Sequence, residues 1–338
     1  MGRGVQGPIA IFLAVAALLV PAHAGAEWFT RDEAIMGTLI RVEVWADART
    51  TGESAINEVM AEMRRIDHAM SPYKSDSELS KVNRDAHQKP VVISRELYDL
   101  VVRAAKLSAQ TQGAFDITFS SVGYMYDYRL RVVPSEEQIK KALPAVDYRR
   151  IKLDPAKRTI FFEREGMRID LGGIAKGYAV DRGIGILKKH GITHGLVTAG
   201  GDSRVLGDRR GRPWIIGIRD PRRKDGVVAR IPLANEAIST SGDYERYFEA
   251  GGVRYHHIIN PKTGHSATGV WSVTIIGPDA TMTDGLSTSV FVMGPKAGLT
   301  LVDTMPGIEA VIIDAAGKML YSKGLRDLGR TSESASTK

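Results

Sequence analysis

The segment MTDGLSTSVFVMG, residues 282–294, places a carboxylate and a hydroxyl, Asp284 and Thr288, next to an apolar run. Four residues are about one helical turn, so in a helix the two oxygens would lie on one face. Oxygen ligands of this kind suit Mg²⁺ or Ca²⁺ rather than zinc or copper. The alternative is helix capping, in which Asp284 or Thr283 accepts hydrogen bonds from free backbone N–H groups. The segment by itself leaves both interpretations open.

A second candidate is DLGGIAKGYAVD, residues 170–181. The pair Gly172 and Gly173 precedes a helical pattern, and such a turn can hold a phosphate at a helix N-terminus. The segment is not a Walker A motif, because no hydroxyl follows Lys176, and it lacks the G-x-G-x-x-G fingerprint of dinucleotide sites. The glycines fit a tight turn without a ligand equally well.

Two adjacent histidines, His256 and His257, lie in RYHHIINPKTGHS. Neighbouring side chains in a strand point to opposite faces, so at most one of them faces a given pocket. This argues against a joint metal site and leaves one histidine as a candidate general base, with a structural role as the alternative. In TAGGDSRVLG, Gly200 and Gly201 allow close approach of the backbone to a ligand, or form a β-bulge.

The elements that position these segments mix helices and strands without a regular βαβ rhythm. Apolar periodicity predicts a strand over residues 36–46 and a helix over residues 53–66. Ser94 is expected to cap a second helix, and Ser135 opens a capping box on a short one. Residues 71–83 are expected to be irregular. Further strands are predicted within residues 151–162 (as a hairpin), 167–171, 194–207, 214–220, 237–240, 254–260, 271–277, 309–314 and 318–322.

Several neighbouring strands are hairpin-linked, so we expect an α+β fold. Its sheet should be mixed and largely antiparallel, with packed helices, in one large domain with a smaller subdomain. The 338 residues are 43% hydrophobic and 25% charged, as in ordinary globular proteins. The absence of cysteine excludes disulfides, thiolate metal sites, cysteine nucleophiles and a lipid anchor on cysteine. The net charge is +7, and the densest basic runs, residues 207–214 and 219–226, lie beside Gly and Pro, which favours solvated turns over a nucleic-acid site.

The N-terminus has the pattern of a secretory signal peptide. Its apolar run, residues 9–20, is too short to span a bilayer comfortably, and small residues lead to Ala24 and Ala26. We expect residues 1–26 to be removed by cleavage after one of these alanines, with an uncleaved anchor as the alternative. No twin-arginine pair is present, which favours the general secretory route. The mature protein is then expected to be periplasmic, with a domain over residues 27–324, a flexible tail over residues 325–338 and no stable membrane anchor.

Taken in order along the chain, these segments resemble the ApbE family, the FAD:protein FMN transferases. The motifs are MGT, SPYKSDSELSKVN, GAFDIT, DLGGIAKGYAVD, AGGD, ISTSGDYERYF, YHHIINPKTG and TDGLSTSVFVMG, and they cover roughly residues 30–322. The resemblance implies an ApbE/T-fold-like architecture and Mg²⁺-dependent transfer of FMN from FAD to a Thr or Ser hydroxyl, forming a phosphoester and releasing AMP.

The same resemblance implies that the acceptor is an exported flavoprotein subunit. Subunits of Rnf- or Nqr-type complexes and proteins like the nitrous-oxide-reduction regulators are the candidate classes, and no nucleic acid is expected as a partner. Two alternatives use the same pocket. One is an FAD pyrophosphatase that gives FMN and AMP, and the other is a non-catalytic periplasmic protein that binds FAD or assists assembly.

The resemblance also implies roles for individual residues. The backbone carbonyl of Gly173 and the side chains of Asp284 and Thr288 correspond to the metal ligands, which makes Asp284 a catalytic residue as well. His257 corresponds to the histidine that assists removal of the acceptor proton. Ile117 stands where family members commonly carry proline, so the local structure over residues 117–135 is left open. The residues expected to contact FAD are Met36, Tyr73, Ala114, Phe115, Asp116, Asp170, Lys176 and Ile258.

Overall fold

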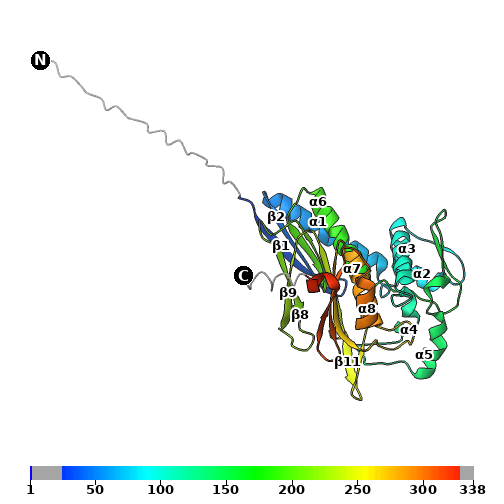
Figure 1. The fold of residues 1–338 in the computed structure, drawn as a ribbon. Coiled ribbons are helices and arrows are strands. Elements are labelled where there is room, and N and C mark those ends of the chain that lie inside the picture. The colour runs from blue at the N-terminus through cyan, green and yellow to red at the C-terminus, as the bar shows by residue number, and fades with distance from the viewer. Residues whose placement is uncertain (2–24, 328–338) are drawn as a thin grey trace.

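A long antiparallel sheet runs through the computed structural model, which describes Met1 and residues 25–327 (Figure 1). The strand order is β1-β2-β6-β7-β10-β13-β14-β15, and every neighbouring pair is antiparallel. The strands are β1 (Glu27–Ile35), β2 (Thr38–Ala46), β6 (Gly195–Ala199), β7 (Asp202–Leu206), β10 (Ala237–Gly242), β13 (Val270–Gly277), β14 (Glu309–Asp314) and β15 (Met319–Tyr321).

The two faces of this sheet are covered by different elements. Helices α1 (Arg49–Met70), α6 (Ala175–Lys189) and α7 (Ala280–Met293) pack on one face, and α8 (Pro295–Val302) follows α7 toward β14. The hairpin of β8 (Trp214–Arg219) and β9 (Val227–Leu233) lies on the other face. It forms a second core there, which consists of Leu196, Val205, Trp214, Leu233, Ile238 and Ile276.

A smaller subdomain lies beside the large sheet (Figure 1). Strands β11 (Tyr247–Ala250) and β12 (Val253–His256) form a hairpin that is a two-stranded sheet of its own, separate from the large sheet. The architecture confirms the expected α+β fold with its largely antiparallel sheet and subdomain. The subdomain contains α2 (Glu78–Asp85), α3 (Arg95–Gln110), α4 (Ser120–Gly123), α5 (Glu136–Ala142), the short 3₁₀ helices η1 (Ile117–Phe119), η2 (Leu143–Ala145) and η3 (Tyr148–Arg150), and a sheet of β3 (Val91–Val92), β5 (Thr159–Phe162) and β4 (Ile151–Asp154).

Helix α7 is buried on nearly all sides, unlike the amphipathic α1. Its hydroxyls avoid a desolvation cost by donating hydrogen bonds back to the helix: Ser287 Oγ to Asp284 O at 2.8 Å, and Ser289 Oγ to Gly285 O at 2.6 Å. The helix can therefore carry polar residues into the interior of the molecule. Asp284 is one of these interior polar residues and is only 2% exposed.

Some elements differ from the sequence-based expectation. Residues 167–171 form no strand, because the Asn83 side chain bonds both the N–H of Ile169 (2.7 Å) and its carbonyl (2.9 Å), in place of a neighbouring strand. Residues 71–83, expected to be irregular, contain the start of α2, which Ser77 caps by accepting from Ser80 N–H. Strands β1, β3, β9 and β11 were not predicted.

The chain ends lie partly outside the described residues. The expected signal peptide falls largely on residues 2–24, which the structure does not describe, and so does most of the expected tail, residues 328–338. Leu325, where we placed the start of the tail, belongs to a helical turn over residues 323–327 and packs against the second core. Within the described part of the chain, no helix is long and apolar enough to cross a membrane.

Gly177 lies where α6 crosses α7. A Cβ at this position would lie 2.0 Å from the carbonyl oxygen of Ala280, so Gly177→Ala should push the helices apart and lower the free energy of unfolding. The expected loss is about 1–3 kcal/mol. Gly185→Ala is the matched control, because no atom outside the local helix backbone lies within 4 Å of its Cβ. Alanine there should stabilise α6 by about 0.5–1 kcal/mol. Urea unfolding of both variants measures the difference, and equal stabilities would contradict the close crossing.

Candidate active site

Helices α6 and α7 run antiparallel at their crossing, and each supplies a carboxylate to the first turn of the other. Asp284 Oδ2 on α7 accepts a hydrogen bond from Gly177 N–H at 2.9 Å. Asp181 on α6 accepts from the N–H groups of Ala280 and Thr281, both at 2.9 Å. Carboxylates in these places satisfy free N–H groups and oppose the positive end of the helix dipole. The two helices are thereby fixed in register around Asp284.

This arrangement corrects the capping interpretation of residues 282–294. Helix α7 begins at Ala280, and its N-cap is Asp279, whose side chain accepts from Met282 N–H at 2.9 Å. Neither Thr283 nor Asp284 caps α7. Asp284 does act as a cap, but for α6, a helix that starts more than a hundred residues earlier in the chain.

The three expected metal ligands are brought together. Thr288 lies one turn after Asp284 on α7, and its hydroxyl is 3.3 Å from Ser241 Oγ of β10. The Gly173 turn reaches the same place, because a Cβ on Gly173 would lie 3.4 Å from Thr288 Oγ1. The carbonyl oxygen of Gly173 faces α7, 3.9 Å from where a Cβ on Gly285 would stand. Backbone and side-chain oxygens therefore converge at this point.

A buried charge cluster surrounds these oxygens. The Lys176 ammonium forms a close ion pair with Asp202 and lies 3.5 Å from Asp284 Oδ1. Burial and the neighbouring Asp202 raise the pKa of Asp284 above the usual range of a carboxyl. Burial disfavours the Lys176 ammonium, but Asp202 and Asp284 outweigh this effect, so the pKa of Lys176 is raised. When both carboxylates are ionised, the single ammonium leaves one negative charge uncompensated.

This cluster fits a hard divalent cation. The donors are one carboxylate, one hydroxyl and one carbonyl, the oxygen ligands that Mg²⁺ accepts together with water or phosphate oxygens. Burial, and secondly the charge of Asp202, disfavour the ionised form of Asp284, and a bound cation would offset both effects. Within the described residues, no three His, Asp or Glu side chains are grouped as a metal site, so a site made only of such side chains is absent there.

The adjacent histidines have separate environments. His256 is buried, with Nε2 donating to Ala267 O at 2.8 Å and Nδ1 accepting from Ile258 N–H at 3.3 Å. Both of its nitrogens are therefore occupied, and its role is structural. The Nδ1 of His257, by contrast, is buried without a hydrogen-bond partner among the described residues. Burial, together with the charge of Arg246, lowers the pKa of His257 to about 3, so the ring is neutral at physiological pH.

The hairpin turn between β1 and β2 forms one wall of the site. Met36 and Gly37 both have positive φ, 56° and 68°, as in a type I′ turn, and such a φ is unusual for methionine. Gly200 of the β6–β7 turn lies against this hairpin, where a Cβ would be 2.6 Å from Thr38 Oγ1. The guanidinium of Arg246 reaches over the turn, 3.2 Å from the Cβ position of Gly37.

Tyr73 and Asp170 both lie within electrostatic reach of Arg246. Tyr73 is 84% exposed, and its hydroxyl lies within electrostatic reach of both Asp170 and Arg246. The carboxylate of Asp170 accepts from Gly172 N–H at 2.6 Å, and burial raises its pKa. An exposed aromatic ring of this kind can stack on a planar ligand.

The remaining expected FAD contacts lie deeper. Phe115 is buried, and its ring lies 3.3 Å from the Cβ position of Gly173, with Ala114 buried beside it. Asp116 opens η1 by accepting from Thr118 N–H at 2.8 Å, and its other oxygen accepts from Tyr148 N–H at 2.9 Å. Burial raises the pKa of Asp116. Both oxygens of the Asp116 carboxylate are therefore hydrogen-bonded within the protein, and they hold the start of η1 against Tyr148.

Sequence reasoning missed several residues of the site. They are Asp181, Asp202, Ser241 and Arg246, and each acts through a contact that joins distant parts of the chain. A weak signal existed for two of them, because Asp202 directly follows the paired glycines of AGGD and Arg246 lies in GDYERY. Asp181 and Ser241 also lie in quoted motifs, DLGGIAKGYAVD and ISTSGDYERYF, but nothing in these motifs indicates which distant group each side chain contacts.

Comparisons with known proteins show the family and the fold of the chain. Residues 36–312 match the model of the ApbE family. The FAD:protein FMN transferase of Treponema pallidum is 34% identical over 88% of this chain and 88% of its own. The ApbE protein of Thermotoga maritima has a crystal structure with a TM-score of 0.83 at 36% identity, covering 89% of this chain and 98% of that one. The flavinyl transferase ApbE of Pseudomonas stutzeri, in its apo form, gives a TM-score of 0.78 at 30% identity, covering 90% and 96%.

Proposed function

The chain belongs to the ApbE family, and from this premise we propose that it transfers FMN from FAD to a Thr or Ser hydroxyl of an acceptor protein, releasing AMP. The observation that carries the proposal is the proximity of three groups, since the charges of Arg246 and Lys176 both act on His257 and Lys176 lies beside Asp284. The three groups are the oxygen cluster at Asp284, the neutral and half-buried His257, and the unpaired Arg246 beside the strained Met36 turn.

We further propose that Mg²⁺ is the metal, held by the carboxylate of Asp284, the hydroxyl of Thr288 and the carbonyl of Gly173. When bound, the ion would offset the negative charge of the FAD pyrophosphate and the charge that develops on phosphorus during transfer. The Lys176 ammonium contacts the carboxylates of both Asp202 and Asp284. It would hold Asp284 in place and, through its ion pair with Asp202, keep that second carboxylate from binding the metal.

The other residues bind the substrate and handle the proton. Arg246 is exposed, and no ion pair occupies its guanidinium among the described residues, so it is free to bind a phosphate oxygen. His257 is uncharged, so its free Nδ1 has a lone pair that can accept the proton of a threonine hydroxyl, which is otherwise a poor nucleophile; its lowered pKa makes it a weaker base than an ordinary histidine. Tyr73 can cover the flavin and restrict the access of water.

One incubation tests the proposed function against its two alternatives. The protein is mixed with FAD, MgCl₂ and a recombinant flavoprotein domain, and the products are separated on a denaturing gel and by chromatography. A fluorescent band at the mass of the acceptor, with stoichiometric AMP, is the expected result. Free FMN and AMP without a band would instead indicate hydrolysis, and intact bound FAD would indicate a binding protein. Omitting MgCl₂ and adding EDTA should abolish the band.

The location and the acceptor class are parts of the same proposal. We propose export to the periplasm, which the apolar run of residues 9–20 and the small residues after it support, and an exported flavoprotein subunit as acceptor. Cell fractionation with an antibody to the mature domain tests the location. Recovery of the protein in the cytoplasm with residues 1–26 still attached would contradict it.

A further inference from the structure

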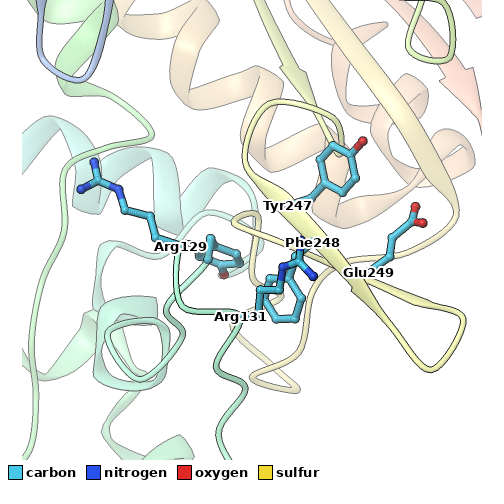
Figure 2. A pocket seen from close by; sticks show the side chains of 6 residues that line it. Arg129, Arg131, Tyr247, Phe248 and Glu249 are labelled. Carbon is cyan, nitrogen blue, oxygen red and sulfur yellow. The ribbon is translucent and has the colours of Figure 1, made fainter.

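A surface pocket of about 450 Å³ lies between the loop of residues 127–132 and strand β11 (Figure 2). Figure 2 shows Arg131 on the loop beside Phe248 of β11, while Arg129 extends from the loop in another direction. We call this surface the arginine–aromatic pocket. It is lined by Tyr128, Arg129, Arg131, Tyr247, Phe248 and Glu249.

The loop that carries the two arginines is closed and internally bonded. Asp127 and Val132 exchange backbone hydrogen bonds of 3.1 and 2.8 Å, and Asp127 Oδ1 accepts from the N–H groups of Arg129 and Leu130, both at 2.9 Å. Arg131 has a positive φ of 57°, which is unfavourable for a side chain of its kind and is typical of positions where function retains strain. The loop thus presents its arginines from a fixed backbone, which lowers the entropic cost of binding.

The pocket has a net positive charge. Neither Arg129 nor Arg131 forms an ion pair within the described part of the chain, although both are exposed. Glu249, the one carboxylate of the lining, is paired with Arg254 at 2.8 Å, so it does not neutralise them. Between the arginines, Leu130 is 75% exposed, and aromatic rings form the floor. A ligand for this surface should combine carboxylates with some apolar surface.

The pocket lies close to residues of the candidate active site. The Tyr128 hydroxyl donates to the carbonyl of His256 at 3.3 Å, and Tyr247 is paired with His256 across the β11–β12 hairpin. On the other side, the charge of Arg129 reaches the hydroxyl of Tyr73. A polypeptide bound in the pocket would therefore pass close to His257 at the base of the hairpin.

We propose that the arginine–aromatic pocket docks an acidic segment of the acceptor protein, next to the hydroxyl residue that receives FMN. The inference rests on the transferase function proposed above and adds the chemistry by which the acceptor is selected. Carboxylates of the segment pair with Arg129 and Arg131, and its apolar side chains cover Leu130 and Tyr247. Arginine clusters that bind acidic motifs in this way are a common mode of peptide recognition.

Binding of defined peptides in the absence of FAD tests the docking step separately from transfer. Two fluorescein-labelled dodecapeptides are used, each with one threonine and the same apolar residues; one carries four Asp or Glu residues, and the other carries Asn or Gln in their place. In fluorescence anisotropy, the wild-type protein should bind the acidic peptide roughly tenfold more tightly at low salt, since each exposed ion pair contributes little. The preference should fall as salt is added.

The variant Arg129→Glu/Arg131→Glu should lose this preference and bind a lysine-substituted peptide better than the acidic one. Arg230→Glu is the matched control, because Arg230 is also exposed, with no side-chain partner among residues 25–327, and lies on β9. It should keep the preference, and thermal unfolding should show all proteins folded. The proposal would be overturned if the wild type bound the two peptides equally. It would also be overturned if Arg230→Glu lost the preference for the acidic peptide as fully as the double variant does. Acidic preference without any FMN transfer to an acceptor would leave the docking intact and refute the transferase function.

Discussion

Replacing Asp284 with asparagine should lower the rate of FMN transfer by at least about 10²-fold, with the fold intact. The amide oxygen of asparagine can still accept the hydrogen bond from Gly177 N–H, which Asp284 Oδ2 accepts at 2.9 Å, so α6 keeps its cap. The charge that would hold the cation is lost. The measurement is the initial rate of AMP release with acceptor present, over a series of MgCl₂ concentrations. If the loss arises from metal binding, higher Mg²⁺ should restore part of the rate.

Asp181→Asn is the matched control for this variant. Asp181 caps α7 as Asp284 caps α6, and it is also paired with Arg204 at 2.7 Å, but it does not reach the Gly173 turn. The control should lose about 1 kcal/mol of unfolding free energy through a weaker cap and keep most of its activity. If the two asparagine variants lost activity equally, the role of Asp284 would be structural and the metal assignment would fail.

The fold was predictable where one face of an element is buried. Residues 53–66 and 36–46 follow the helical and strand periods because α1 and β2 each press one apolar face on the same core. The periodicity of residues 167–171 predicted a strand as well, but their backbone partner is the side chain of Asn83. A hydrophobic pattern indicates which residues are buried, but it does not indicate which group forms hydrogen bonds with their backbone N–H and C=O.

The site was predictable in its residue types and less so in its contacts. The alternation of side chains in a strand indicated that only one of His256 and His257 could face a pocket, and the structure places them in different environments. The one-turn spacing of Asp284 and Thr288 holds in α7. Which helix Asp284 caps depends on the crossing at Gly177, and a contact across more than a hundred residues leaves no local pattern.

Exchange of His257 for glutamine should reduce FMN transfer by about 10²–10⁴-fold, the usual contribution of a general base, without changing FAD affinity. The same exchange at His256 should act on stability instead. His256 bonds both Ala267 O and Ile258 N–H, so its loss should lower the unfolding free energy by about 1–3 kcal/mol. Transfer assays, FAD titration and urea unfolding of both variants separate the two effects. An active His257→Gln protein would exclude the imidazole as the base.

The pH profile of the wild-type protein gives an independent test of the same role. Burial and the charge of Arg246 lower the pKa of His257 to about 3, which favours the neutral ring in the free enzyme. A group with a lowered pKa is protonated only when the pH falls to that value, so the proton-accepting form persists from pH 8 down to pH 5. The pH profile of kcat/KM, which reports on the free enzyme, should therefore have no inflection near pH 6.5 that is due to His257. An inflection of that kind would be present in the wild type and absent from His257→Gln. Such an inflection would mean that the ring titrates as in water and that the charge of Arg246 does not act on it. The burial and the charge of Arg246 that keep the ring neutral also oppose its protonation, so the negative charge of bound FAD must offset them when His257 takes the acceptor proton.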